Sequence, residues 1–321
     1  MTRIMKKMNS MSDEELFSFI TFSKERSESV AYSGYSYWKS TFKLFMSQRT
    51  TRIMLYFLIS LLLFTFIQPY LPSQKSPTEI FLNPETGRQY HNVQPNSEFW
   101  FGTNIIGQDL WSRIWSGTRT SLFIAVVAVL SSTIIGITIG AIWGYVRPLD
   151  PLITEIYNVL NNIPLTVLRT LLAYVLRPSL KTIILSMCLT NWIGMAKWIR
   201  NLIIIIRDRE YNLASRCLGT PIPRVIVKNL LPQIVSVVMM DMALSIPGVI
   251  GSEVFLTYVG LGLPIDTPSL GNLIEEGRRV MMNPSQMYQL VFPAVVVAAV
   301  TICFYVLGNK FADASDPRNH V

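Results

Sequence analysis

The sequence predicts an all-α integral membrane protein with about six transmembrane helices. Hydrophobic residues make up 50% of its 321 residues and charged residues only 15%, whereas soluble proteins average about a quarter charged. The mean hydropathy is +0.36. Several apolar runs reach the roughly 20 residues that a helix needs to cross a bilayer. These features exclude an ordinary soluble enzyme, a disordered chain and a disulfide-stapled domain.

Three segments are apolar and free of charge over the length of a span. They are predicted transmembrane helices at 53–71, 121–146 and about 290–307. The first begins too far from the N-terminus for a signal peptide, and no small-residue cleavage site follows it.

Three further spans are predicted although they carry or border charges. A charge at the bilayer centre costs roughly 2.5–3.5 kcal/mol, so these helices must pack against protein or water. They are 152–176 with Glu155 and Arg169, 182–196 running into Lys197, and 233–263 with Asp241 and Glu253.

The basic residues indicate the orientation. Most of the 28 lysines and arginines fall in segments that share one side if the N-terminus is cytoplasmic, and the positive-inside rule then favours cytoplasmic N- and C-termini. Topology and anionic lipid explain the net charge of +8, so no nucleic-acid partner is expected. The predicted order is a cytoplasmic tail (1–52), the first span (53–71), an extracellular loop (72–120), a transmembrane core of five spans (121–308) and a cytoplasmic tail (309–321).

Two segments have the pattern of helices lying in the membrane interface. In 35–48, Trp38, Phe42, Phe45 and Met46 recur at helical spacing beside lysines. This helix either anchors the tail to lipid or contacts another subunit. In 107–119, two tryptophans and two aliphatic residues share one face, which fits a helix at the outer surface.

Gly136, Gly140 and Gly144 form a ladder of small residues within the second span. Such spacing lets another helix approach closely. Catalytic and cofactor chemistry is not expected in this chain. The three cysteines form no CxxC pair, there are two histidines, and no GxxxxGK[ST] loop for ATP phosphates is present.

Residues 207–232, between the fourth and fifth spans, predict a short cytoplasmic helix. Asp208 is a suitable N-cap, and Gly219 followed by prolines ends the helix. A helix over 209–218 would be about 15 Å long, too short to cross. Leu213, Ala214 and Cys217 would share a face able to enter a groove on a soluble partner.

This segment resembles the EAA–G–LP signature of ABC-importer permeases through Glu210, Ala214, Gly219 and Leu231-Pro232. Three other runs resemble the dipeptide/oligopeptide branch of that family: Phe101-Gly102-Thr103 through Ser121-Leu122, Glu253 through Gly271, and Ala312 through Arg318. Four substitutions depart from the family pattern: Ser215, Asn229, Asn104 and Gln108. Because Gln108 is uncharged, a salt bridge that the family pattern implies at this position is in doubt.

The resemblance implies an ABC-importer permease fold with an interfacial elbow helix and a cytoplasmic coupling helix. It also implies a non-catalytic subunit that moves oligopeptides by alternating access. The expected location is the cell membrane of a Gram-positive bacterium. The implied partners are a homologous second permease, two ATPase subunits that bind ATP and Mg, an extracellular lipoprotein receptor, the peptide and membrane lipid. The residues expected to dock the ATPase are Glu210, Leu213, Ala214, Ser215, Cys217, Gly219 and Pro232.

The charges inside the spans are candidates for the translocation pathway or its gate. Arg169 and Glu253 lie at similar predicted depths, so we hypothesise that they face a central cavity and pair directly or through water. The alternative is that Arg169 extends to the outer surface and Glu253 bonds only to backbone. Asp241 is a further pathway candidate.

Other functions remain open from the residues alone. A proton-driven secondary transporter could use Asp241 and Glu253, although no repeat of the kind common in such folds is visible. An importer for nickel or another small solute would share the same motifs. A structural membrane scaffold would show no transport phenotype on deletion.

Overall fold

The structure is a computed structural model, which describes residues 37–84 and 87–315. Residues 1–36 of the predicted N-terminal tail and 316–321 of the predicted C-terminal tail therefore lie outside the described residues, and with them the part of the Ala312–Arg318 motif beyond Ser315. Within the described ranges the regular elements are helical, apart from two isolated β-bridges.

Among the described residues, five helices are long and apolar enough to cross a membrane. They are α5 (Arg49–Ile67), α6 (Leu110–Tyr145), α9 (Leu180–Arg207), α12 (Leu231–Tyr258) and α14 (Tyr288–Ser315). Each contains a mostly apolar stretch of at least 18 residues, although α9 and α12 also carry polar and charged side chains. Backbone groups in lipid must bond within the helix.

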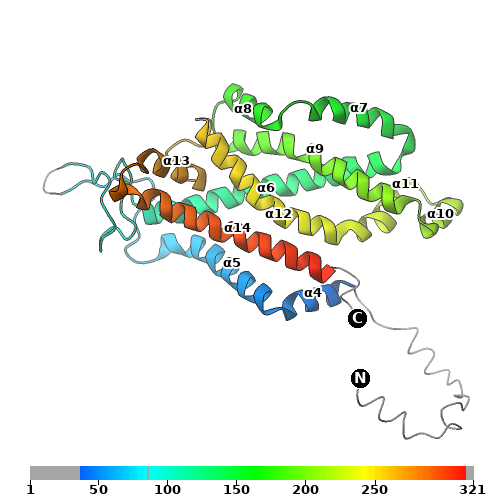
Figure 1. The fold of residues 1–321 in the computed structure, drawn as a ribbon, viewed down its shortest axis with the longest axis horizontal. Coiled ribbons are helices and arrows are strands. Elements are labelled where there is room, and N and C mark those ends of the chain that lie inside the picture. The colour runs from blue at the N-terminus through cyan, green and yellow to red at the C-terminus, as the bar shows by residue number, and fades with distance from the viewer. Residues whose placement is uncertain (1–36, 85–86, 316–321) are drawn as a thin grey trace, which may run out of the picture.

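The segment predicted as the third span is two short helices, α7 (Asp150–Asn161) and α8 (Leu165–Val175). Pro164 lacks a backbone N–H and disfavours helical geometry at Ile163 before it, which breaks the helix there. With 12 and 11 residues, neither helix reaches the roughly 30 Å of a bilayer core. End to end they run alongside α9 (Figure 1).

The prediction of a separate interfacial helix at 107–119 is wrong, because these residues lead into and begin a long helix. Asp109 caps a single helix, α6, that continues for 36 residues, or about 54 Å. No proline lies between the outer turns of α6 and its membrane-spanning part, so the two form one continuous helix. A separate helix does occur before α5: α4 (Tyr37–Ser47) ends where Gln48 adopts an extended conformation.

Helices α6 and α9 run in the same direction, because α7 and α8 together return the chain between them (Figure 1). The N-terminal end of α4 and the C-terminal end of α14 lie at one end of the molecule. The short helix α10 (Glu210–Cys217) lies at this same end, followed by α11 (Ile222–Val225). The outer loop and α13 (Leu270–Val280) occupy the opposite end. This arrangement separates the two predicted membrane sides.

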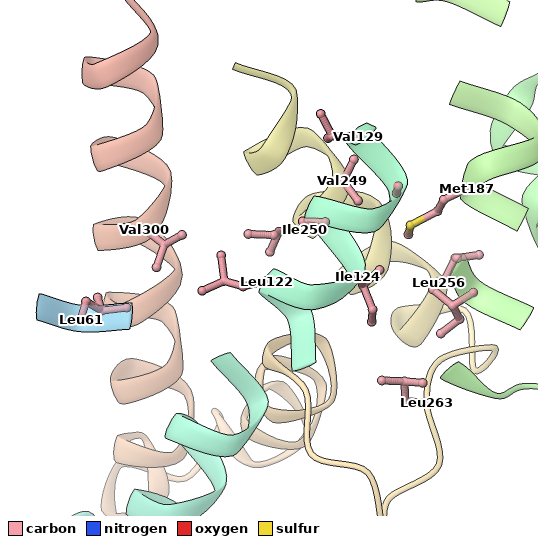
Figure 2. Packing of buried hydrophobic residues seen from close by; sticks show 13 residues of the cluster. Leu61, Leu122, Ile124, Val129, Met187, Val249, Ile250, Leu256, Leu263 and Val300 are labelled. Atoms are coloured by element: carbon pink, nitrogen blue, oxygen red, sulfur yellow. The ribbon is translucent and has the colours of Figure 1, made fainter. Parts of the chain in front are cut away.

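The largest buried apolar cluster joins α5, α6, α9, α12 and α14 near the middle of the molecule. Figure 2 shows its side chains converging from these helices, with Ile124 and Ile250 at most 1% exposed. Beside it, the glycine ladder of α6 packs against α9. A Cβ at Gly140 would lie 2.5 Å from the Ala196 carbonyl oxygen, so only glycine allows this approach.

The outer end is held by a buried ion pair. The Arg113 guanidinium, fully buried, donates to Glu276 of α13 at 2.8 Å and also to Gln108. Asn104 donates to both Gln108 and Glu276. The two residues that depart from the family pattern here, Asn104 and Gln108, thus join the network that fastens the outer loop to α13.

Candidate functional site

A cavity of about 380 Å³ lies between α6, α8, α9 and α12. Its lining is polar for the interior of a membrane protein, because hydroxyl, amide and charged side chains face it together with small residues. The lining residues are Val129, Ser132, Thr133, Leu165, Arg169, Asn191, Gly194, Met195, Trp198, Asp241, Ser245, Gly248, Val249 and Ser252.

Arg169 reaches this cavity from α8. Its guanidinium donates to Thr190 at 2.8 Å, to Asn191 at 2.6 Å and to Ser252 at 3.3 Å. All three acceptors are neutral, and together they fix the planar group between α9 and α12. The charge is held in place without being neutralised.

Asp241 reaches the same cavity from α12, where Ser245 donates to its carboxylate at 3.4 Å. The polar and small lining residues of α12 recur at helical spacing: Asp241, Ser245, Gly248 and Ser252. Sequence reasoning singled out Asp241 but missed this stripe. The signal that could have found it is polar and small residues repeating every three or four positions in an otherwise apolar helix.

The hypothesis that Arg169 and Glu253 pair is wrong for this structure. Glu253 is fully buried, away from the cavity, and beside the start of α13. Its polar neighbours are the hydroxyls of Ser121 and Ser269 and the backbone N–H of Gly271. Adjacent residues on a helix point in different directions, so Ser252 meets Arg169 while Glu253 faces the other way.

The predicted cytoplasmic helix is α10, two turns from Glu210 to Cys217. Gly219 ends it in the left-handed conformation, with φ of +74°. The Thr220 N–H bonds to the Ser215 carbonyl, and the Gly219 N–H to the Arg216 carbonyl. This pair of bonds is the Schellman motif, in which glycine is favoured because it lacks a Cβ.

Asp208 does not cap α10, although the sequence suggested it. Its carboxylate instead pairs with Arg147 at 2.9 Å and Arg207 at 3.2 Å. Slight burial opposes the charged form, but bonds from these two arginines dominate and lower the pKa of Asp208 below its usual value. The carboxylate thereby ties the start of the segment to the turn after α6.

Asn212 anchors α10 and was missed by sequence reasoning. It is fully buried and donates to the Ile206 carbonyl at 2.8 Å, at the end of α9. A lone asparagine in a polar segment carries no sequence signal for this role. On the other side of α10, Tyr211 donates to Gln233 of α12 at 2.8 Å.

The remaining surface of α10 is open. Leu213 is 43% exposed and Leu218, just after the helix, is 85% exposed. Ala214 and Cys217 are exposed beside them. The exposed face of α10 is the one expected from the sequence, whereas Pro232 belongs to a different helix, in the first turn of α12.

The five long apolar helices in the described part of the chain, with a broken pair and a polar cavity between them, define a multi-pass membrane protein. The chain belongs to the family of binding-protein-dependent transport system inner membrane components, whose family model matches residues 136–321. Members of this family are permease subunits, which are transport components and not catalysts.

Individual relatives cover nearly the whole chain. The oligopeptide transport system permease protein AmiD of Streptococcus pneumoniae is 38% identical over 96% of this chain and 98% of its own length. The dipeptide transport system permease protein DppC of Bacillus subtilis is 32% identical over 91% of this chain and 89% of its own. A chain of an inward-facing methionine ABC transporter matches with a TM-score of 0.47 at 17% identity, over 61% of this chain and 94% of that one, a likeness from which nothing follows here.

Proposed function

We propose that this chain is one permease subunit of an ATP-driven importer that brings oligopeptides into the cell. The observation that carries the proposal is its similarity along 96% of its length to an oligopeptide permease. The proposed assembly contains a homologous second permease, two ATPase subunits that bind ATP and Mg, and an extracellular lipoprotein receptor that delivers peptide.

The proposed ATPase-docking surface is the open face of α10. Leu213, Ala214, Cys217 and Leu218 offer apolar contacts, and a short amphipathic helix entering a groove is a common mode of recognition. Asn212 and Tyr211 connect α10 to α9 and α12. Movement of the ATPases would therefore pass directly to two helices that line the cavity.

The proposed pathway includes the cavity that contains Arg169 and Asp241. Alternating access requires contacts that differ between the outward-open and inward-open states, because a partner can shift an equilibrium only through differential binding. The break at Pro164 makes α8 a separate element, able to move relative to α7 while carrying Arg169.

Co-purification tests the proposal. The tagged chain is extracted from its native membrane in a mild detergent, and the subunits that accompany it are identified by mass. We expect two ATPases and a second permease with the wild-type chain. Leu218→Asp places a charge in the proposed docking face, so the ATPases should be lost while the second permease remains.

A matched control uses the same substitution at an exposed leucine of the outer end. Leu82 is 55% exposed, and Leu82→Asp should keep every subunit. A wild-type chain that purifies alone would exclude the importer assembly and favour a self-sufficient transporter. ATPases retained by Leu218→Asp would exclude this docking face.

A further inference from the structure

The cavity between α6, α8, α9 and α12 holds one positive and one negative side chain that neutralise neither each other nor another ionised group among the described residues. Arg169 is bonded to Thr190, Asn191 and Ser252. Asp241 is bonded to Ser245. Charges within a membrane protein are costly and mark sites of function when they lack a fixed partner.

Each charge has the chemistry of one end of a peptide. A guanidinium presents a planar set of donors that matches a carboxylate, and Arg169 is already oriented by its neutral acceptors. A carboxylate accepts hydrogen bonds from an ammonium group. A zwitterionic peptide with free termini is therefore complementary to the cavity at both ends.

The rest of the lining is small or neutral. Gly194, Gly248, Ser132 and Thr133 face the cavity, and none offers a charged group for a particular peptide side chain. The volume of about 380 Å³ lies within the roughly 300–1,000 Å³ of ligand pockets. Such a lining selects for the termini and not for the amino-acid sequence between them.

Given the proposed function, we propose that the cavity binds passing peptides through their termini, with Arg169 receiving the C-terminal carboxylate and Asp241 the N-terminal ammonium. This assigns two charged side chains of the chain to opposite ends of one substrate. Peptides with blocked termini lose the corresponding contact.

The spacing of the two charges also indicates a peptide length. Arg169 meets Ser252, which lies on the same helix as Asp241 and eleven residues later. At 1.5 Å per residue the two levels are about 16 Å apart along α12. The charged groups themselves are closer, because the Asp241 carboxylate bonds to Ser245 and the Ser252 hydroxyl bonds to the Gly248 carbonyl. An extended peptide covers roughly 3.5 Å per residue, so at most about four or five residues fit between the charges.

The test uses the whole importer, purified and reconstituted in liposomes with its receptor. The probes are tetra-alanine, its N-acetyl form and its C-terminal amide, and uptake of each is measured for the wild type, Arg169→Gln and Asp241→Asn. Uptake by a variant is divided by wild-type uptake of the same peptide, which cancels the preference of the receptor.

Loss of a charge-assisted hydrogen bond corresponds to about a tenfold effect or more. We expect Arg169→Gln to slow uptake of tetra-alanine and its N-acetyl form by this factor while barely changing the amide. Asp241→Asn should slow tetra-alanine and the amide while barely changing the N-acetyl form. Arg169→Lys should restore part of the response to a free carboxylate. Arg177→Gln, which removes an exposed arginine outside the cavity, is the control and should affect no probe.

The outcomes separate this inference from the proposed function. If the wild-type complex does not import tetra-alanine, the proposed function fails. If it does, and each variant slows all three probes by the same factor or none of them, the termini are not bound by these side chains. Di-alanine is too short to reach both charges, so it should respond to only one of the two variants. If both variants slowed the uptake of di-alanine, the inferred peptide length would be wrong.

Discussion

Two acidic residues of α12 that the sequence treats alike have different surroundings. Asp241 faces a cavity of about 380 Å³, whereas Glu253 is fully buried beside the start of α13. Both carboxylate oxygens of Glu253 are buried there without a hydrogen-bond partner among the described residues, and burial of this kind disfavours the charged form. At the residue scale, the direction in which an acidic side chain faces decides whether it is enclosed by packed helices or open to a cavity where it can contact a substrate.

The close contact of Gly140 with α9 leads to the first prediction. In Gly140→Ala the new Cβ would lie 2.5 Å from the Ala196 carbonyl oxygen, so the helices must separate. We expect a loss of about 1–3 kcal/mol of stability, although alanine favours helix by about 1 kcal/mol. The measurement is thermal unfolding of the purified protein in detergent.

Gly194→Ala is the matched control on the facing helix. No atom lies within 4 Å of the Cβ position at Gly194, so its midpoint temperature should be unchanged or higher. Equal destabilisation by both substitutions would show that packing of α6 on α9 is not what Gly140 provides.

At the scale of elements, two residues that depart from the family pattern hold α10 to the segment just before α12. The Asn229 side-chain amide donates to the Ser215 hydroxyl at 3.1 Å. Two unusual residues therefore meet, one on α10 and the other just before α12. A family signature describes each position separately, whereas the fold places this pair in contact.

A double-mutant cycle tests this contact. Ser215→Ala and Asn229→Ala should each reduce peptide-stimulated ATP hydrolysis by the assembled importer, and the double variant should lose less than the two effects combined. The expected coupling is about 0.5–1.5 kcal/mol, the net value of a hydrogen bond. Strictly additive effects would show that the two side chains act independently.

The outer helix α13 carries a pH-dependent contact. Glu275 accepts hydrogen bonds from Arg278 at 2.7 Å and Arg279 at 3.2 Å. The bond from Arg278 is the main cause that holds the pKa of Glu275 below its ordinary 4.5. Because the folded pKa is lowered, the contact stabilises the protein fully above the unfolded pKa, and this contribution disappears as the pH falls through the folded pKa.

Glu275→Gln makes this prediction measurable. The midpoint of thermal unfolding should be lower than that of the wild type near neutral pH. The difference should shrink as the pH falls below 4.5, since the wild-type carboxyl is then protonated too. A difference that stays constant with pH would mean that the charge of Glu275 contributes nothing.

At the scale of the whole molecule, α10 and the ends of α4 and α14 lie at one end, and the outer loop lies at the other (Figure 1). The distribution of basic residues assigns the α10 end to the cytoplasm. The buried pair of Arg113 and Glu276 fastens the opposite end. The molecule thus has an exposed helical face on α10 at one end and, at the other, an outer loop fastened to α13 by an ion pair.

Cysteine labelling checks this orientation. Cys217 is exposed, Cys188 is partly buried and Cys303 is buried. In cells that express this chain alone, a membrane-impermeant thiol reagent should label Cys217 only after the membrane is permeabilised. Cys217→Ser should abolish the signal. Ser73→Cys, at an exposed position of the outer loop, should be labelled in intact cells, and the reverse pattern would invert the topology.

Sequence patterns predicted the helical membrane fold and the exposed face of α10 because both depend on local properties. Apolar runs decide which helices can span a bilayer, and Gly219 supplies the left-handed turn that ends α10. The break before Pro164 was readable in principle, since proline interrupts a helix wherever its neighbours do not compensate. The continuity of α6 could not be predicted from the sequence. The aromatic face of 107–119 suits either a separate interfacial helix or the outer turns of a long helix.

The sequence by itself determined the class of this protein, its family and the location of its cytoplasmic helix, since hydropathy, charge bias and motifs are properties of nearby residues. Only the tertiary structure decided that Arg169 and Asp241 share a cavity, that Glu253 lies outside it, and that Ser215 meets Asn229. The physical reason is that each of these facts depends on how helices rotate and pack against one another. Hydropathy along the chain does not specify that rotation when several faces of a helix are equally apolar.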